Sequence, residues 1–250
     1  MDSCWTALVL ASLLCISSDA RLLSSTSVYG RTSAAGVADR DEARDFDYFI
    51  FVRKWPGSFC AKHACPLIFN HWFHFTIHGL WPNYNDGTWP QFCGKDYSSY
   101  EDQIRDLLDE LRSEWPNAYK FEEQYWYHQW SKHGTCAPDV FPTERSYFQN
   151  VLNLHRRYDL TAALGQAGIL PSTETVYRTK DVVNAIYNAY GVRPLVHCYD
   201  GELTEIWLCL DKKLRSFDCD ASHERNDCQK VKIPSFGKTH RPEGQELDVQ

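Results

Sequence analysis

The first hydrophobic positions of the ordered chain predict β-structure. The run FDYFIFV at 46–52 is almost continuously apolar and has strand propensity throughout, which is typical of a buried strand. A second strand over 72–78 would alternate between two faces. The face expected in the core carries Phe73, Phe75 and Ile77, and the opposite face carries Trp72, His74, Thr76 and His78. Gly79 and Trp81-Pro82 predict the end of this strand just after His78.

The middle of the chain has helical periodicity. Residues 98–115 carry an apolar stripe, with Ser98 or Ser99 as the expected cap and Pro116 as the stop. Further patterns predict helices over 122–133, from Thr143 to about Tyr158, over 160–165, and from a capping Asp181 to Gly191.

Strand patterns return in the last third of the chain, near 195–199, 203–210 and 214–218. Strands first, helices in the middle and strands last are typical of an α+β fold. We therefore expect a single domain over 45–231, with a largely antiparallel β-sheet packed against several α-helices.

Both ends of the chain differ in composition from this domain. Residues 1–20 contain a short apolar run followed by small residues, which predicts a secretory signal peptide. Residues 21–44 are rich in Ser, Ala and Gly without periodicity, so we expect a disordered leader or propeptide. Residues 232–250 predict a polar C-terminal tail. No later stretch predicts a membrane span, and the expected location is secreted or vacuolar.

Cysteine usage supports export. The chain has ten cysteines, and removal of residues 1–20 takes away Cys4 and Cys15. An even set of eight then remains, which indicates a disulfide framework formed in an oxidising compartment. A zinc site would require CxxC pairs, which the sequence lacks. Eight cysteines allow roughly 105 connectivities, so the cysteine positions alone leave the pairing open.

The charge balance limits the kind of nucleic-acid binding that is possible. The formal net charge is −7, and it becomes −5 when the segment with Asp2 and Asp19 is removed. An acidic protein gains little from bulk attraction to nucleic acid. Any RNA must therefore be bound at a local site.

The stretch WYHQWSKHGTC at 126–136 supplies such a site. On a helix, His128, Gln129, Lys132 and His133 fall within an arc of roughly 140°. Gly134 follows as a helix stop. Two imidazoles and an ammonium on one rigid flank suit acid–base chemistry on an anion.

Two motifs identify a family. FTIHGLWP at 75–82 and the pattern HxxxKHGTC at 128–136 resemble the two active-site segments of the ribonuclease T2 family. The resemblance runs from about Phe46 to Cys228, and the leader, acidic balance and eight cysteines are most similar to the plant S-like members. It implies an endoribonuclease that cleaves single-stranded RNA by transphosphorylation through a 2′,3′-cyclic phosphate, as a monomer and without a metal or other cofactor.

The resemblance also implies roles for individual residues. His133 would be the general base and His78 the general acid, with the roles reversed when the cyclic phosphate is hydrolysed. His128 and Lys132 would bind phosphate and stabilise the transition state, and Trp81 would orient the catalytic groups. These roles agree with elementary chemistry, since imidazoles with pKa near 6.5 can both take and give a proton near neutral pH.

Two positions depart from the family pattern. Gln129 stands where the family normally has Glu, and a carboxamide cannot ionise. We therefore expect reduced activity, a lower pKa of His133 and a shifted pH optimum. Lys54 stands where the family usually has Gln, so it is a candidate phosphate contact in place of a base contact. Trp89 and Phe92 are candidate stacking surfaces for bases, although packing roles suit them equally well.

The same resemblance proposes a disulfide pairing, namely Cys60–Cys65, Cys93–Cys136, Cys198–Cys228 and Cys209–Cys219. A metal site at His71, His74 and His78 is not expected, because no carboxylate stands at ligand spacing and the HExxH signature is absent. The alternative to an active ribonuclease is a catalytically impaired family member that serves in storage, defence or RNA binding. Gln129 motivates that alternative, whereas the presence of both His78 and His133 opposes it.

Overall fold

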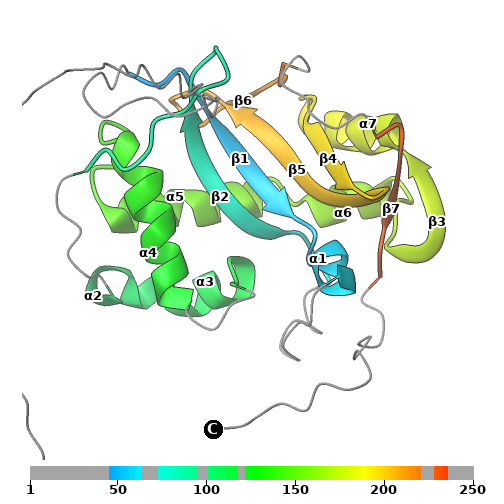
Figure 1. Cartoon of the computed structure of the whole chain (residues 1–250), viewed down its shortest axis with the longest axis horizontal. Helices are drawn as coiled ribbons and strands as arrows, with labels where there is room; N and C mark the ends of the chain where they lie inside the picture. Colours follow the sequence, from blue (N-terminus) through cyan, green and yellow to red (C-terminus); the bar gives the residue numbers. More distant parts are fainter. Residues whose placement is uncertain (1–44, 63–72, 95–100, 118–121, 221–227, 236–250) are drawn as a thin grey trace, which may run out of the picture. The chain divides into compact units, whose positions relative to one another are not determined.

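The computed structural model describes residues 45–62, 73–94, 101–117, 122–220 and 228–235, which belong to one compact unit (Figure 1). The predicted signal peptide, the leader and most of the tail therefore lie outside the described residues. No helix within the described ranges is long and apolar enough to cross a membrane.

A twisted β-sheet forms the centre of the fold. Its main path runs β2-β1-β5-β7-β3, and β4 and β6 also pair with β5. All of these pairings are antiparallel except the contact between β5 and β7. The strands are β1 (Tyr48–Lys54), β2 (Thr76–Asn83), β3 (Ser172–Arg178), β4 (Leu195–Tyr199), β5 (Glu202–Leu210), β6 (Ser216–Phe217) and β7 (Lys230–Ile233). The predicted α+β class with a largely antiparallel sheet is confirmed.

Helices from the middle of the chain pack against this sheet. Helix α5 contacts β2, and α7 contacts β3 and β4. Their buried apolar side chains merge with those of β1, β2 and β5 into one core. The helices are α1 (Pro56–Lys62), α2 (Glu101–Ile104), α3 (Leu108–Glu114), α4 (Glu122–Lys132), α5 (Glu144–Arg157), α6 (Leu160–Gln166) and α7 (Thr179–Tyr190), with 3₁₀ turns at Arg105–Leu107 and Gly134–Cys136.

The second strand differs from its prediction. It begins at Thr76 and ends at Asn83. It therefore continues through Gly79 and Trp81-Pro82, which were expected to end it. Pro82 is tolerated because β2 stands at the end of the described strand order, where a missing backbone N–H breaks no further ladder. Phe73 lies ahead of the strand and is 62% exposed, so its predicted core position is wrong.

His78 sits at a bulge in the middle of β2. In the pairing with β1, Val52 lies opposite Gly79 and Arg53 lies opposite Ile77, which leaves His78 as the extra residue. A bulge releases one residue from the ladder and re-aims its side chain. Ile77 consequently stays in the core at 0% exposure, while the His78 side chain is 35% exposed.

Helix boundaries were predicted with mixed success. Thr143 caps α5 through a reciprocal bond with Ser146, and Gly191 ends α7 in the left-handed conformation, as expected. Asp181 is wrong as the cap of α7, because α7 starts at Thr179 and the Asp181 carboxylate pairs with Arg178. The predicted helix 98–115 is interrupted by the 3₁₀ turn, and its expected caps Ser98 and Ser99 lie outside the described residues.

Three disulfides of the expected pairing are present in the described part of the chain. Their Cα–Cα separations are 4.9 Å for Cys93–Cys136, 6.3 Å for Cys198–Cys228 and 5.3 Å for Cys209–Cys219. The expected Cys60–Cys65 bridge cannot be followed, since Cys65 lies outside the described residues. The ordered fold also continues to Ile233, which is 1% exposed, past the predicted boundary at residue 231.

Candidate active site

Helix α4 carries one half of the site. Glu122 and Glu123 occupy its first turn and Lys132 its last, a charge order that suits the helix dipole. His133 follows directly and is only 6% exposed. Gly134 then starts a 3₁₀ turn, and a Cβ at that position would lie 2.2 Å from the Trp130 ring. The turn therefore requires glycine, and it fixes where His133 leaves the helix.

Trp81 contacts both candidate catalytic histidines. Its ring stacks on His133 at a centroid distance of 5.2 Å, and it meets the His78 ring edge-on at 4.9 Å. Gly79 leaves room for this arrangement, because a Cβ there would lie 2.1 Å from Trp81 Nε1. Strand β2 and the end of α4 thus bring His78 and His133 into contact with a single indole.

A carboxylate from β5 holds His78. Glu205 Oε1 lies 2.5 Å from His78 Nδ1, and its other oxygen accepts a hydrogen bond of 2.8 Å from Trp207 Nε1. Burial alone raises the pKa of Glu205, but the hydrogen bond and charge of His78 outweigh that effect and the pKa is lowered. Glu205 is therefore ionised near neutral pH, and because it holds Nδ1, the Nε2 atom of His78 points away from it.

Hydrogen bonds also fix the backbone at His78. Its carbonyl oxygen accepts hydrogen bonds from Trp115 Nε1 at 3.0 Å and from Tyr125 Oη at 2.9 Å. Tyr147 Oη donates to the carbonyl of Leu80, two residues further on, at 3.1 Å. Three aromatic donors from α4, α5 and the end of α3 therefore position the His78 segment.

The histidines beside Lys132 are poised in the neutral form. Burial lowers the pKa of His133 well below its ordinary value, and the charges of Lys132, His128 and His78 lower it further. The pKa of His128 is also lowered, by partial burial and by Lys132. No described residue bonds His133 Nδ1, which is buried. A neutral imidazole can accept a proton, so His133 is suited to act as a base.

Gln129 belongs to the same contact network. It is 3% exposed, and its Oε1 accepts a hydrogen bond of 3.2 Å from Trp81 Nε1. It therefore takes part in orienting the indole that contacts both histidines. It supplies no negative charge to stabilise an imidazolium.

The two aromatic residues proposed to stack on bases differ in their position relative to the site histidines. Phe92 lies against His128 with ring centroids 5.9 Å apart, and its N–H donates to the carbonyl of Lys132 at 3.0 Å. Its φ of 54° is unusual for a bulky residue, so the chain holds this ring in place at some cost. Trp89 is half-buried, and among the described ring contacts none joins it to a site histidine.

Lys54 does not have the position expected of a phosphate contact. Its Nζ donates to the carbonyl of Pro116 at 3.2 Å and lies 5.6 Å from the centre of the Tyr125 ring. Burial lowers its pKa to about 8, although Glu205 acts in the opposite direction. Lys54 therefore interacts with Tyr125 and Glu205, two residues that contact His78.

Comparison with known proteins agrees with the two motifs. The model of the ribonuclease T2 family matches residues 46–220. The chain belongs to the ribonuclease T2 family. It is 38% identical over 208 residues to ribonuclease 3 of Arabidopsis thaliana, covering 78% of this chain and 92% of that protein. It is 37% identical over 180 residues to the extracellular ribonuclease LE of Solanum lycopersicum, covering 68% of this chain and 78% of that protein.

Solved structures of family members share the fold. RNase NT, crystallised in complex with 5′-AMP, matches with a TM-score of 0.70 and 34% sequence identity, covering 76% of this chain and 99% of that one. The single-domain architecture of this chain is therefore that of the ribonuclease T2 family.

Sequence reasoning missed the residues that hold His78. Glu205 carried a usable signal, because it is an acidic residue in the middle of the apolar strand ELTEIWLCL. Trp115 and Tyr125 carried none, since aromatic residues at helical spacing are ordinarily read as core.

Proposed function

We propose that this endoribonuclease cleaves single-stranded RNA by metal-independent transphosphorylation, with His133 as the general base and His78 as the general acid. The observation that carries the proposal is that both imidazoles contact the same indole, that of Trp81. Such a pair can remove the proton of the 2′-OH on one side of a phosphate and protonate the departing 5′-oxygen on the other.

The two histidines differ in the way that these roles require. His133 is buried among positive groups, which favours the neutral imidazole of a base. His78 is held through Nδ1 by the carboxylate of Glu205, which leaves Nε2 as the nitrogen proposed to give its proton to the leaving group. Lys132 lies near His133 and supplies positive charge for the developing phosphorane, and the exposed His128 is assigned to binding the phosphate.

The same geometry allows the second step. After cyclisation His133 carries the proton and His78 has lost one, so the roles reverse when water attacks the 2′,3′-cyclic phosphate. Phe92, held against His128, is the proposed stacking surface for a base, and Trp89 is assigned a packing role.

The alternative of an impaired, non-catalytic family member rests on Gln129. Against it, Gln129 keeps a hydrogen bond to Trp81, and both proton-transfer groups are held by several contacts. We therefore expect a slower enzyme and not an inactive one.

A single assay separates these possibilities. Purified, oxidised protein is incubated with a dinucleotide in excess chelator, and the products are resolved by chromatography. A 2′,3′-cyclic phosphate is expected. Folded protein that forms no product would refute the proposal and favour a binding or storage role, and product formed only when a divalent metal is added back would refute metal independence.

The proposed location is the secretory route, as an extracellular or vacuolar monomer. It is supported by the predicted signal peptide and by the disulfides of the described domain. Relatives in the family include both extracellular and intracellular ribonucleases. Fractionation of cells that express the full chain tests this assignment.

A further inference from the structure

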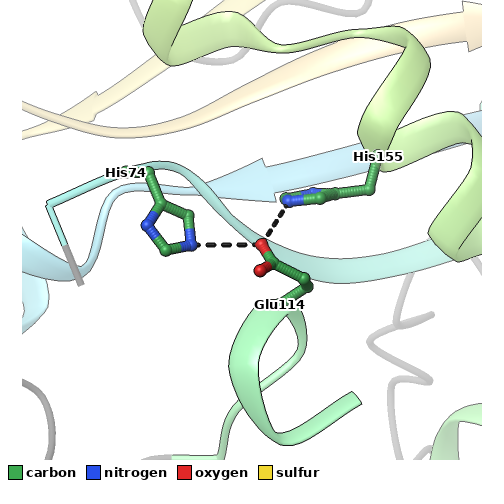
Figure 2. Close-up of side chains that lie close together, drawn as sticks. All are labelled: His74, Glu114 and His155. Atoms are coloured by element: carbon green, nitrogen blue, oxygen red, sulfur yellow. Dashed lines mark hydrogen bonds and ion pairs between the residues drawn. The ribbon is translucent and has the colours of Figure 1, made fainter. Parts of the chain in front are cut away.

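A second group of ionisable side chains lies outside the catalytic site. His74 precedes β2, Glu114 is the last residue of α3, and His155 lies in the last turn of α5. Figure 2 shows the two imidazole rings approaching one carboxylate from different sides. Glu114 Oε2 lies 3.1 Å from His74 Nε2 and 2.7 Å from His155 Nε2. No local sequence pattern indicates this group, because Glu114 is 40 residues from His74 and 41 residues from His155.

The geometry points to a binding site for a divalent transition-metal ion, such as Zn²⁺, formed by His74, Glu114 and His155. Each residue offers one ligand atom, and these atoms all lie within 4.8 Å of one another. Ligands at about 2.1 Å from a tetrahedral Zn²⁺ are roughly 3.4 Å apart. The two distances from Glu114 Oε2, 3.1 Å and 2.7 Å, are about 0.3 Å and 0.7 Å short of that spacing, so small side-chain rotations would admit an ion.

The donor types suit such an ion. Two imidazole nitrogens and one carboxylate oxygen converge here, and these are ligand types that Zn²⁺ takes in proteins.

The cluster has an anchored side and an accessible side. The His155 side chain is 9% exposed, whereas those of His74 and Glu114 are 33% and 24% exposed. The second carboxylate oxygen of Glu114 accepts from Ser113 Oγ at 2.7 Å, which orients Oε2 toward the histidines. An ion can therefore enter past His74 and keep a water molecule as its fourth ligand.

Arg53 limits the affinity. Its buried guanidinium donates to the carbonyls of Phe75 and Tyr158, and its charge acts on His155. The nearby positive charge opposes a cation, and a three-residue site with an open position binds more weakly than a closed structural site. A stabilising or regulatory role suits such a site, since it links the segment ahead of His78 to two helices.

Metal-stripped full-length protein is titrated with Zn²⁺ by calorimetry in a non-coordinating buffer near neutral pH. One ion per chain is expected. His74→Ala and Glu114→Gln are each expected to weaken binding by at least about tenfold, since loss of even an outer-shell partner of a ligand costs roughly 10–100-fold. The matched control is Glu110→Gln, on the same helix, whose carboxylate pairs with Arg156 and which should bind as the parent does.

His133→Ala separates this cluster from the catalytic histidines, and it should keep the Zn²⁺ site. Absence of binding to the parent chain would overturn the proposal. Unchanged affinity in both His74→Ala and Glu114→Gln would also overturn it, as would binding that is lost only in His133→Ala.

Far-ultraviolet circular dichroism confirms that each variant is folded, and Co²⁺ absorption of the parent chain provides a second readout of a site with nitrogen ligands. Because the proposed cleavage is measured in excess chelator, the two proposals can fail separately.

Discussion

At the scale of single residues, Gln129 is expected to affect the basicity of His133. His133 directly follows α4, four residues after Gln129. Burial and the charges of Lys132, His128 and His78 lower its pKa, and among the described residues no carboxylate offsets them. A base with a lowered pKa stays neutral at lower pH but takes a proton less strongly. This predicts a ribonuclease with an acid-shifted profile and a modest rate.

Replacing Gln129 with Glu tests this reading. A carboxylate at this position favours the imidazolium form, so the acidic limb of kcat/KM should move to higher pH by about one unit, equivalent to about 1.4 kcal/mol. We also expect kcat at neutral pH to rise severalfold. The measurement is a pH–rate profile on a dinucleotide.

The matched control for this substitution is Gln124→Glu, which places the same charge at an exposed position of α4. It should leave the profile in place. Profiles and rates of Gln129→Glu that coincide with those of the parent would contradict the assigned influence of Gln129.

Glu205 is expected to position His78, the proposed general acid. Its carboxylate holds the His78 ring through Nδ1, so Glu205→Gln replaces a charged hydrogen bond with a neutral one and should slow proton transfer to the leaving oxygen. We expect kcat to fall roughly 10–100-fold, the usual cost of losing a group that orients a catalytic or metal-bound histidine. Glu174→Gln, at an exposed position of β3, is the control. A kcat of folded Glu205→Gln near the parent value, or a loss seen only in KM, would contradict this positioning role.

At the scale of elements, the Cys93–Cys136 disulfide joins the two halves of the site. It ties the segment with Phe92 to the 3₁₀ turn that follows His133. Its loop spans 43 residues, against 10 for Cys209–Cys219. The chain-entropy relation gives about 4 kcal/mol for the longer loop and about 3 kcal/mol for the shorter one.

Paired Cys→Ser replacements therefore separate stability from function. Loss of Cys93–Cys136 should reduce both the free energy of unfolding in urea and kcat/KM, because His133 loses its covalent anchor. Loss of Cys209–Cys219 should reduce the free energy of unfolding while leaving kcat/KM near the parent value under folding conditions. Equal effects of the two replacements on kcat/KM would count against the positioning role of the first disulfide.

The elements also show where sequence reasoning stops. β1, α4 and α5 are recovered closely because periodicity, caps and charge order agree along each of them. β2 was misplaced because Gly79 and Pro82 are strand breakers in isolation, whereas here close packing against Trp81 and an end-of-sheet position accommodate them. β3 and β7 were missed because each is short or largely exposed and is stabilised mainly by pairing with the other.

At the scale of the whole molecule, the site combines residues whose proximity only the folded sheet creates. The histidines and Lys132 were found because two local motifs carry them. The contact between Glu205 and His78 joins β5 to β2 across β1, and it follows from strand order and from a one-residue bulge. No local pattern encodes either feature, so motif reading recovered the proton-transfer groups and left out the residues that hold them.

The acidic character of the whole molecule makes a final prediction about RNA binding. With a formal charge of −7, attraction to phosphate has to come from the few cations in the site. At neutral pH Lys132 is the main one, because partial burial and Lys132 itself lower the His128 pKa.

For single strands, log K against log salt has a slope of about −0.7 per neutralised phosphate. A 2′-deoxy oligonucleotide, which cannot be cleaved, should therefore bind with a slope of about −0.7 near pH 7, and steeper, toward about −1.4, in acid as His128 becomes charged. Fluorescence anisotropy at several salt concentrations measures this slope. Lys132→Gln should bring it close to zero at neutral pH, whereas Lys180→Gln, at an exposed position of α7, should leave it unchanged. A slope several times steeper, unaffected by Lys132→Gln, would show that RNA is held by an extended cationic surface and not by this local site.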